Sequence, residues 1–337
     1  MVVNLVSKRD QESARRLVEA NGFVFEHNFD VLVGIFESGE LIATAARDRN
    51  IFKMICIQDE FQGGGLLGEL LTALFSSCDA CARDNFFIFT KPDRRQSFEQ
   101  FNFKPLVEHP SLCLMEYGRG LQKYLQLHNT LIKPGHNGAV VINANPFTLG
   151  HQYLVEQASS QVDHLYVFVV REDCSVFPFD VRFRLVQEGT AHLDNVTVLE
   201  TSDYAVSSVT FPSYFLKADD DIPCLQMEVD LLLFARKIAP PFHIVKRFIG
   251  TEPNCLTTRY YSEIMLRVLQ QEGVETIQLE RKASSGQAIS ASRVRELIKD
   301  EAYEEINKLI PETTLQFLKS DQAEKIRQRM KSYQRRH

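Results

Sequence analysis

Short apolar runs alternate with helical patterns along the whole chain, and this alternation predicts an α/β protein. The strands predicted for the first third lie at residues 31–36, 41–46, 52–57 and 86–90. Those predicted further along lie at residues 139–142, 164–170, 196–200, 246–250 and 276–279. A helix near residues 181–188 is expected to be capped by Asp180. Because strands and helices keep alternating in the second set, we expect a Rossmann-like, doubly wound parallel sheet there.

The pattern breaks at Pro134-Gly135, where neither a strand nor a helix continues readily. The residues just before this pair carry a short helical pattern. We therefore predict a first domain at residues 1–117, a linker at 118–137, a second domain at 138–320 and a basic helical tail at 321–337. The tail is expected either to be a solvated end or to dock an acidic carrier protein.

Length and composition exclude several classes of protein. The 337 residues are 44% hydrophobic, which is enough for two separate cores. Acidic and basic residues are interspersed and the net charge is −6, so we expect no nucleic-acid partner. Because no stretch approaches the roughly 20 apolar residues of a membrane helix, we expect no membrane partner and a cytoplasmic location.

The seven cysteines are odd in number and scattered, which does not fit a secreted disulfide framework and favours a reducing compartment. Only Cys78 and Cys81 are close together in the sequence. A zinc site would need a second pair of ligands nearby, and the sequence offers none there. We therefore expect both cysteines to pack in a helix, and we predict no metal-binding residues.

The candidate chemistry of the second domain centres on residues 138–158, GAVVINANPFTLGHQYLVEQA, where a strand, a turn and a helix are expected. A helix N-terminus presents unpaired N–H groups and the positive end of the helix dipole, so an anion can bind there. Gly150 would allow close backbone approach, and His151 would face the anion from the first helical turn. We predict a nucleotide-phosphate site that includes Asn145, Thr148, Gly150 and His151.

A second signature, ISASRVR at residues 289–295, is expected at the start of another helix. Ser290 and Ser292 could donate to phosphate oxygens, and Arg295 could neutralise charge on pyrophosphate as it leaves. That chemistry suits adenylyl transfer. The alternative is structural, with the serines only capping a helix and the arginine forming a surface ion pair.

Several other residues are weaker candidates because of their position. They either follow an expected parallel strand, at the edge of the sheet where ligands bind, or are charged residues within or next to an apolar run. A bare charge among apolar residues would be costly, and residues that follow a strand reach the carboxyl edge of the sheet. These weaker candidates for ligand binding, set against plain surface roles, are Lys217, Asp230, Gly250 and Glu252.

The first domain has its own glycine-rich turn, FQGGGLLG at residues 61–68, followed later by FEQFNFKP at residues 98–105. Together these segments resemble the acyl-CoA-dependent N-acetyltransferase (GNAT) family, which implies a mixed-sheet domain. The resemblance implies a possible cradle for a CoA-type pyrophosphate, formed by Gln62, Gly63, Gly65 and Gly68. The sequence departs from the family pattern at two positions. Leu67 stands where glycine or alanine is usual, and Asn102 stands where glycine is usual. The alternative is that the domain is a scaffold or docking module.

The two signatures of the second domain, Thr148-x-Gly-His151 and ISxSxxR at 289–295, together resemble the nucleotidylyltransferase superfamily, whose members cleave ATP between the α- and β-phosphates. With NPFTLGH at 145–151, FPSYFLK at 211–217, IGTEP at 249–253 and the GNAT-like domain, nearly the whole chain resembles the citrate lyase ligase family. This resemblance implies ATP-dependent acetylation, from acetate, of the thiol prosthetic group on the acyl carrier subunit of citrate lyase. AMP and pyrophosphate would be released, and Mg²⁺ would assist.

The resemblance also implies residue roles. His151 and Arg295 would be catalytic, and the other motif residues would bind ATP phosphates. The first motif position is Thr148 where many relatives have histidine, which leaves His151 as the main side-chain catalyst.

Two other functions stay open from the sequence. A plain adenylyltransferase of the pantetheine-phosphate type would transfer AMP onto a phosphate and would need no acetate. An acetyl-CoA-dependent acetyltransferase or binding module would use the glycines of the first domain, with the second domain regulatory. Acetate dependence and acetyl-CoA binding would distinguish the three.

Overall fold

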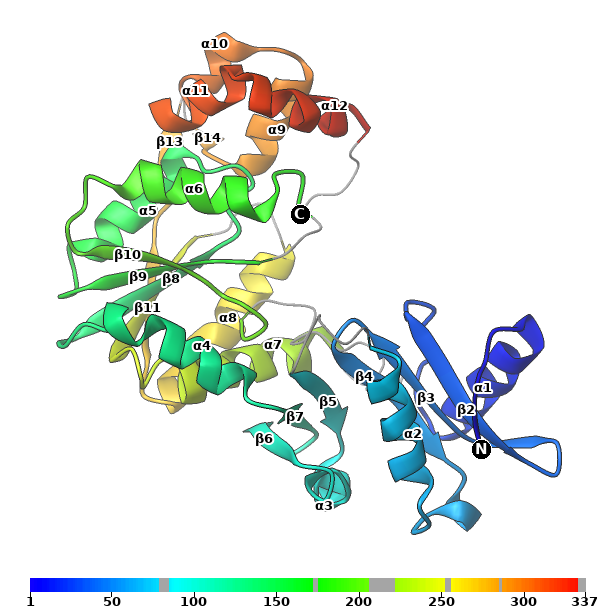
Figure 1. Cartoon of the computed structure of the whole chain (residues 1–337). Coiled ribbons are helices and arrows are strands. Elements are labelled where there is room, and N and C mark those ends of the chain that lie inside the picture. The colour runs from blue at the N-terminus through cyan, green and yellow to red at the C-terminus, as the bar shows by residue number, and fades with distance from the viewer. Residues whose placement is uncertain (79–84, 172–174, 206–221, 252–255, 285–286, 333–337) are drawn as a thin grey trace. The chain divides into compact units, whose positions relative to one another are not determined.

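The computed structural model describes residues 1–78, 85–171, 175–205, 222–251, 256–284 and 287–332. The chain forms two compact units, which are described here one at a time (Figure 1). The first comprises Met1–Leu127 and the described part of Phe211–Val229, and the second comprises the described parts of His128–Thr210 and Asp230–His337. The domain boundaries given above stay a prediction.

The first unit is built on a seven-stranded mixed sheet. Its strands, in spatial order, are β1 (Val2–Asn4), β2 (Val31–Glu37), β3 (Glu40–Asp48), β4 (Ile51–Ile57), β5 (Phe86–Thr90), β7 (Cys113–Tyr117) and β6 (Phe103–Glu108). Neighbouring strands are antiparallel except for β4 and β5, which pair in parallel through two residues of each strand, Ile51 with Phe87 and Phe52 with Ile88. The GNAT-like mixed-sheet domain is confirmed.

Among the described residues, α1 (Lys8–Ala20), α2 (Leu66–Ser76) and α3 (Arg95–Glu99) pack on strands of this sheet. Helix α4 (Gly120–His128) follows the last strand, β7, along the chain. The leucine stripe of α2 packs its buried members Leu70, Leu71 and Leu74 against the sheet, as the helical spacing predicts. The helix ends before Cys78, so the prediction that Cys78 packs in a helix is wrong, because the chain already turns at Ser77. Cys81 lies outside the described residues.

The second unit contains a five-stranded sheet in which all neighbours are parallel. The spatial order is β10 (Val196–Glu200), β9 (Leu165–Val169), β8 (Asn137–Ile142), β11 (Ile244–Gly250) and β12 (Glu275–Leu279). The chain runs from β8 towards β9 and β10 on one side, and β11 and β12 extend the sheet on the other. The strand order therefore reverses between β8 and β11, which confirms the Rossmann-like doubly wound sheet. Ligands of such sheets bind in the crevice at the switch in strand order, so a ligand is expected at the carboxyl ends of these two strands.

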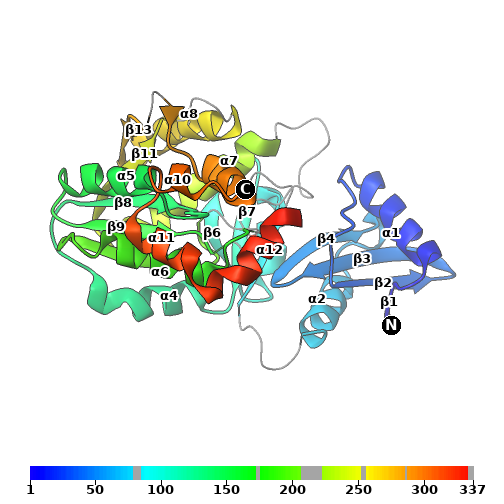
Figure 2. The ribbon, with the colours of Figure 1, turned by 90° about the horizontal axis from the view of Figure 1, so that it is seen from above.

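Helices cover both faces of the parallel sheet, with α5 (Leu149–Ser159) and α6 (Phe179–Thr190) on one face and α8 (Leu256–Gln271) on the other (Figures 1 and 2). Helix α7 (Ile222–Leu233) continues into a π-helical turn, Phe234–Ile238. Helix α6 begins after its cap residue Pro178, so Asp180 lies in the first turn instead of capping it. The prediction of an Asp180 cap was wrong, because the helix begins two residues earlier than expected, directly after a proline whose ring fixes its φ.

A two-stranded hairpin and four helices complete the second unit. Their bounds are β13 (Ala283–Ser284), β14 (Gln287–Ala288), α9 (Ala291–Lys299), α10 (Tyr303–Ile306), α11 (Glu312–Lys319) and α12 (Glu324–Ser332). Helix α12 falls within the segment predicted as a tail, and it buries Ile326 and Met330 in the same apolar core as Val140 and Phe248 of the sheet. Helix α12 also packs against α9, so this end of the chain supports the helix that begins with the second motif.

The close packing of α6 against the loop after β8 gives the first testable prediction. Phe147 is fully buried, and a Cβ added at Gly189 would come within 2.3 Å of its ring. We expect Gly189→Ala to lower the free energy of unfolding by about 1–3 kcal/mol, because the ring must leave its buried position. Urea unfolding of the variant would measure the loss.

A second substitution distinguishes this clash from other effects. Adding Phe147→Leu to Gly189→Ala should recover part of the stability, because the smaller side chain makes room for the new methyl group. Alanine favours a helix over glycine by about 1 kcal/mol. A Gly189→Ala variant as stable as the parent, or more stable, would therefore contradict the packing argument.

Candidate active site

The first motif forms the loop from β8 to α5 and the first turn of that helix. Thr148 is the N-cap residue, and its Oγ1 accepts a hydrogen bond from the backbone N–H of His151 at 3.3 Å. In return, Nδ1 of His151 accepts the backbone N–H of Thr148 at 3.1 Å, and Nδ1 lies 2.9 Å from Thr148 Oγ1. This reciprocal capping box fixes both side chains at the start of the helix.

The capping box also fixes the tautomer of the neutral His151 ring. Because Nδ1 accepts the backbone N–H, the proton of the neutral ring resides on Nε2, which becomes a donor. Burial and the positive charge of Arg281 lower the pKa of His151 from 6.5 to about 4. The ring stacks on buried Phe147, with centroids 5.8 Å apart. His151 is therefore a neutral, oriented hydrogen-bond donor at neutral pH.

The second motif forms the N-terminus of α9. Ser290 is its N-cap, and Ser290 Oγ accepts the backbone N–H of Arg293 at 3.2 Å. The guanidinium of Arg295, one turn into the helix, donates to the backbone carbonyl of Asn145 at 2.6 Å and to Ser292 Oγ at 3.0 Å. Arg295 is buried, with 8% of its surface exposed. It does not lie on the surface, where the structural alternative would have placed it.

The structure brings the two motifs into direct contact. Arg295 bonds the loop that carries the first motif, and Gly150 lies against the backbone of Ile289. A Cβ at Gly150 would lie 3.2 Å from the carbonyl oxygen of Ile289, closer than side chains ordinarily pack. Gly150 thus permits the close approach of the second motif itself. The N-termini of α5 and α9 are neighbours for this reason.

Several donors at this junction have no hydrogen-bond partner among the described residues. They include the backbone N–H groups of Gly150, Ala291 and Ser292. The side chain of Asn145 is 3% exposed; its Oδ1 accepts the backbone N–H of Phe177 at 3.0 Å, while its Nδ2 is buried without a partner. A buried unpaired donor is costly, so these groups fit an anion or carbonyl that the site would bind.

Two arginines near this edge were missed by the sequence analysis. Arg182 of α6 is fully buried and donates to the carbonyls of Asn143 and Val170, both at 2.7 Å, which fixes the loops that follow β8 and β9. Its place in an ordinary amphipathic pattern gives no signal. Arg281 follows β12 and acts on His151 through its charge. Its position just after a strand of the parallel sheet is a signal that could have found it.

The weaker candidates have different surroundings. Asp230 is fully buried in α7, where it accepts the hydroxyl of Tyr261 at 2.6 Å; Tyr261 in turn lies 3.5 Å from Arg247. Burial and the neighbouring carboxylate raise the pKa of Tyr261, which stays a donor. Gly250 ends β11 beside Arg281. Lys217 and Glu252 lie outside the described residues.

The glycine-rich turn of the first unit holds its four candidate residues in different ways. The side-chain amide of Gln62 donates to Asp59 Oδ1 at 2.6 Å, and its oxygen accepts from Arg94 at 3.0 Å. Gly63 has a positive φ of 84°, and Cβ atoms added at Gly63 or Gly65 would meet open space. Gly68 is close to the ring of Phe101, 3.1 Å from an added Cβ. Room for a ligand therefore exists at the first two glycines, whereas the third serves packing.

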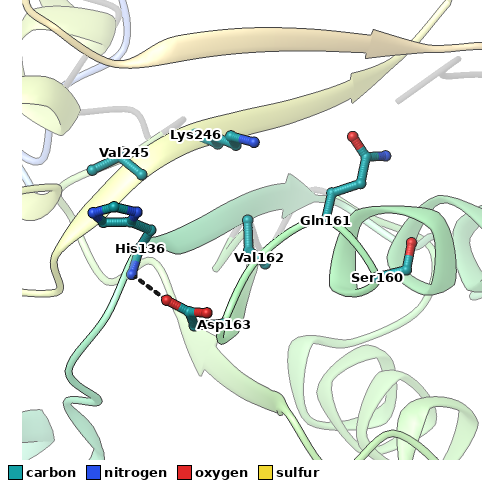
Figure 3. Close-up of a pocket in the computed structure, with 7 residues that line it drawn as sticks. All are labelled: His136, Ser160, Gln161, Val162, Asp163, Val245 and Lys246. Atoms are coloured by element: carbon teal, nitrogen blue, oxygen red, sulfur yellow. Dashed lines mark hydrogen bonds between the residues drawn. The ribbon is translucent and has the colours of Figure 1, made fainter.

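A separate hollow of about 370 Å³ lies at the opposite edge of the parallel sheet (Figure 3). It is lined by His136, Ser160, Gln161, Val162, Asp163, Val245 and Lys246. The backbone N–H of His136 donates to the carboxylate of Asp163 at 2.7 Å across it. Ligands of such sheets bind at the carboxyl ends of the strands, and this hollow lies at the amino ends. We assign it no role in catalysis.

The parallel sheet, its reversal between β8 and β11, and the two joined motifs at that edge define a nucleotidylyltransferase-type protein, here preceded by a GNAT-like unit. Within the described ranges no helix has the length and apolarity needed to cross a membrane. The same residues contain no group of three His, Cys, Asp or Glu side chains able to hold a metal ion.

Comparison with known proteins narrows this class. The family model for the citrate lyase ligase C-terminal domain matches residues 137–318. The citrate (pro-3S)-lyase ligase of Klebsiella pneumoniae is 37% identical over 321 residues, 93% of this chain and 94% of that protein. The corresponding ligase of Escherichia coli (strain K12) is 35% identical over 322 residues, 93% and 91% of the two chains. The chain belongs to the citrate lyase ligase family, and it is an enzyme of the ligase class.

A further relative matches a shorter part of the chain. The phosphopantetheine adenylyltransferase of Streptococcus gordonii is 34% identical over 100 residues, which are 28% of this chain and 61% of that protein.

The lowered pKa of His151 gives a prediction about pH. Between pH 6.5 and about 4 the unfolded chain binds a proton at this residue and the folded chain does not, so the free energy of unfolding should fall as the pH falls through this window. The NMR signals of the His151 ring, assigned with a His151→Gln variant, should titrate near pH 4. A midpoint between pH 6 and 7 would show that burial and the charge of Arg281 do not hold the ring neutral.

Proposed function

We propose that this enzyme activates citrate lyase by acetylating the thiol prosthetic group of its acyl carrier subunit, using acetate and ATP. The family supports the ligase activity and the link to citrate lyase. The observation that carries the ATP-dependent chemistry is the junction of two helix N-termini, with the buried Arg295 and the neutral His151 beside it. Such a junction is suited to the charge of a triphosphate.

The reaction has two steps. An acetate oxygen attacks the α-phosphorus of ATP, the bond to the β-phosphate oxygen breaks, and acetyl-adenylate and pyrophosphate form. The carrier thiolate then attacks the acetyl carbonyl, and AMP leaves with the electron pair of the broken acyl–oxygen bond. Acetate is already ionised at neutral pH, so the first step needs no general base. The protein's contribution is to position the reactants and to stabilise negative charge.

The site residues divide this work. His151 donates from Nε2 to a phosphate oxygen and adds no positive charge of its own. Arg295 holds a fixed positive charge behind the loop of the first motif. The unpaired Nδ2 of Asn145 and the N–H groups of Gly150 and Ser292 supply neutral donors. Neutral donors that are already oriented stabilise the developing charge without the cost of reorganising water.

Mg²⁺ is expected to enter with ATP, bound to its phosphate oxygens, where it would neutralise part of their charge. None of the residue roles above depends on the ion. The carrier subunit as partner, acetate as the acid and the cytoplasm as location belong to this proposal as well.

Exchange of labelled pyrophosphate into ATP tests the first step directly. Wild-type protein should catalyse this exchange only when acetate is present. His151→Ala should slow it by about 100- to 1,000-fold, the usual effect of removing one donor to a charged transition state. His136→Ala, in the hollow at the opposite edge of the sheet, is the matched control and should retain exchange.

The same assay separates the alternatives. Exchange that needs 4′-phosphopantetheine and not acetate would indicate a plain adenylyltransferase. Exchange that persists in His151→Ala would remove this residue from the mechanism. Binding of acetyl-CoA that Gly65→Glu abolishes, without any exchange, would favour an acetyltransferase or binding module in the first unit.

A further inference from the structure

We propose that Arg281 is an additional phosphate-binding residue, which contacts the part of ATP that leaves as pyrophosphate. The inference rests on the ATP site proposed above and names a residue outside both motifs. It is based on where the backbone places Arg281, on what its side chain lies against, and on the chemistry of the guanidinium group.

The backbone fixes Arg281 at the carboxyl edge of the parallel sheet. Its N–H donates to Thr251 Oγ1 at 3.3 Å, and the N–H of Thr251 donates to Leu279 O at 2.9 Å. These bonds tie together the ends of β11 and β12. The side chain then runs past Gly250, because a Cβ added there would lie 3.6 Å from Cγ and 3.7 Å from Nε of Arg281. Arg281 therefore starts on the β11 side of the crevice at the switch in strand order.

The same segment is joined to the helices of both motifs. The carbonyl of Lys282 accepts the N–H of Ile289 at 3.0 Å, one residue before the cap of α9. The ammonium of Lys282 lies 5.9 Å from the ring centre of Tyr153, which belongs to α5. These two contacts place the segment that carries Arg281 beside the helices of both motifs, where the phosphates are expected. The positive charge of Arg281 also contributes, after burial, to the lowered pKa of His151.

The two arginines of the site differ in what they can offer a ligand. Arg295 is 8% exposed and bonds Asn145 and Ser292, so it stabilises the loop as well as the ligand. Arg281 is only partly buried and lies closer to solvent. A planar guanidinium binds two oxygens of a phosphate at once, and it would also bind a carboxylate. Acetate is therefore the second anion that could occupy the same position, and the experiment must separate the two.

The experiment compares Arg281→Gln and Arg281→Lys with Arg293→Gln in the full-length protein. Arg293 is the matched control, because it lies on α9 but directs its guanidinium to Glu296 and Glu305, with 48% of its side chain exposed. Calorimetric titrations with ATP, pyrophosphate and AMP give the three dissociation constants. The exchange assay gives the KM for acetate, and thermal unfolding shows whether each variant is folded.

Loss of a charge-assisted contact should weaken binding roughly 10- to 100-fold. We expect this weakening for ATP and for pyrophosphate in Arg281→Gln, with AMP bound as in the wild type. Arg281→Lys should lose less, because it keeps the charge but not the two-pronged geometry. Arg293→Gln should bind all three ligands normally. The midpoint of the His151 ring titration should rise in Arg281→Gln, because the substitution removes a positive charge that lowers the pKa of this ring.

Unchanged affinity for ATP and pyrophosphate in folded Arg281→Gln would overturn the inference. AMP binding weakened to the same degree would instead indicate contact with the nucleoside, and a raised KM for acetate with normal ATP binding would indicate the acid. If Arg281→Gln does not fold, the Arg281→Lys variant tests the inference instead. Wild-type affinity for pyrophosphate in that variant would contradict a contact through two guanidinium N–H groups. A different observation would contradict the proposed function itself: the wild-type protein would then show no acetate-dependent exchange.

Discussion

The hydrogen bond from Arg295 to the carbonyl of Asn145 is the interaction on which the site depends. It joins two helices whose N-termini both carry the positive end of a dipole, and it adds a buried cation between them. Like charges gathered in this way repel each other and lose hydration. Backbone carbonyls offset part of that cost at Arg295 and Arg182. Two helix N-termini with a buried arginine between them are suited to an anionic ligand such as a triphosphate.

This constraint explains why His151 is held neutral. A protonated imidazole at the same place would add another positive charge to a region that already carries several. Burial and the positive charge of Arg281 keep the ring neutral. The capping box with Thr148 uses Nδ1 as the acceptor, so the proton of the neutral ring lies on Nε2 and the ring contributes a donor and no charge. Thr148 thus fixes the tautomer and the orientation of His151.

Much of the fold could be predicted, because alternation and glycine–proline punctuation report local structure directly. The parallel sheet follows from that alone, whereas the pairing of the two motifs was expected from the resemblance to the nucleotidylyltransferase superfamily. The role of Gly150 could not be foreseen, since it serves the approach of Ile289, which is remote in sequence. Arg182 was missed for a similar reason, whereas the place of Arg281 just after a strand could have revealed it. A buried arginine whose partners are carbonyls has the same local pattern as an exposed one, and only tertiary structure distinguishes them.

The departures of the first unit from the acetyltransferase pattern can be accommodated by its fold. Leu67 packs against the apolar core, so its side chain is not committed to the turn at Gly63 and Gly65. Asn102 has a φ of 65° and takes the left-handed conformation that glycine usually supplies, which asparagine tolerates better than other residues. Neither change fills the open space at the glycines. A fold kept intact does not by itself imply a retained ligand, so the sequence departures argue neither for nor against binding there.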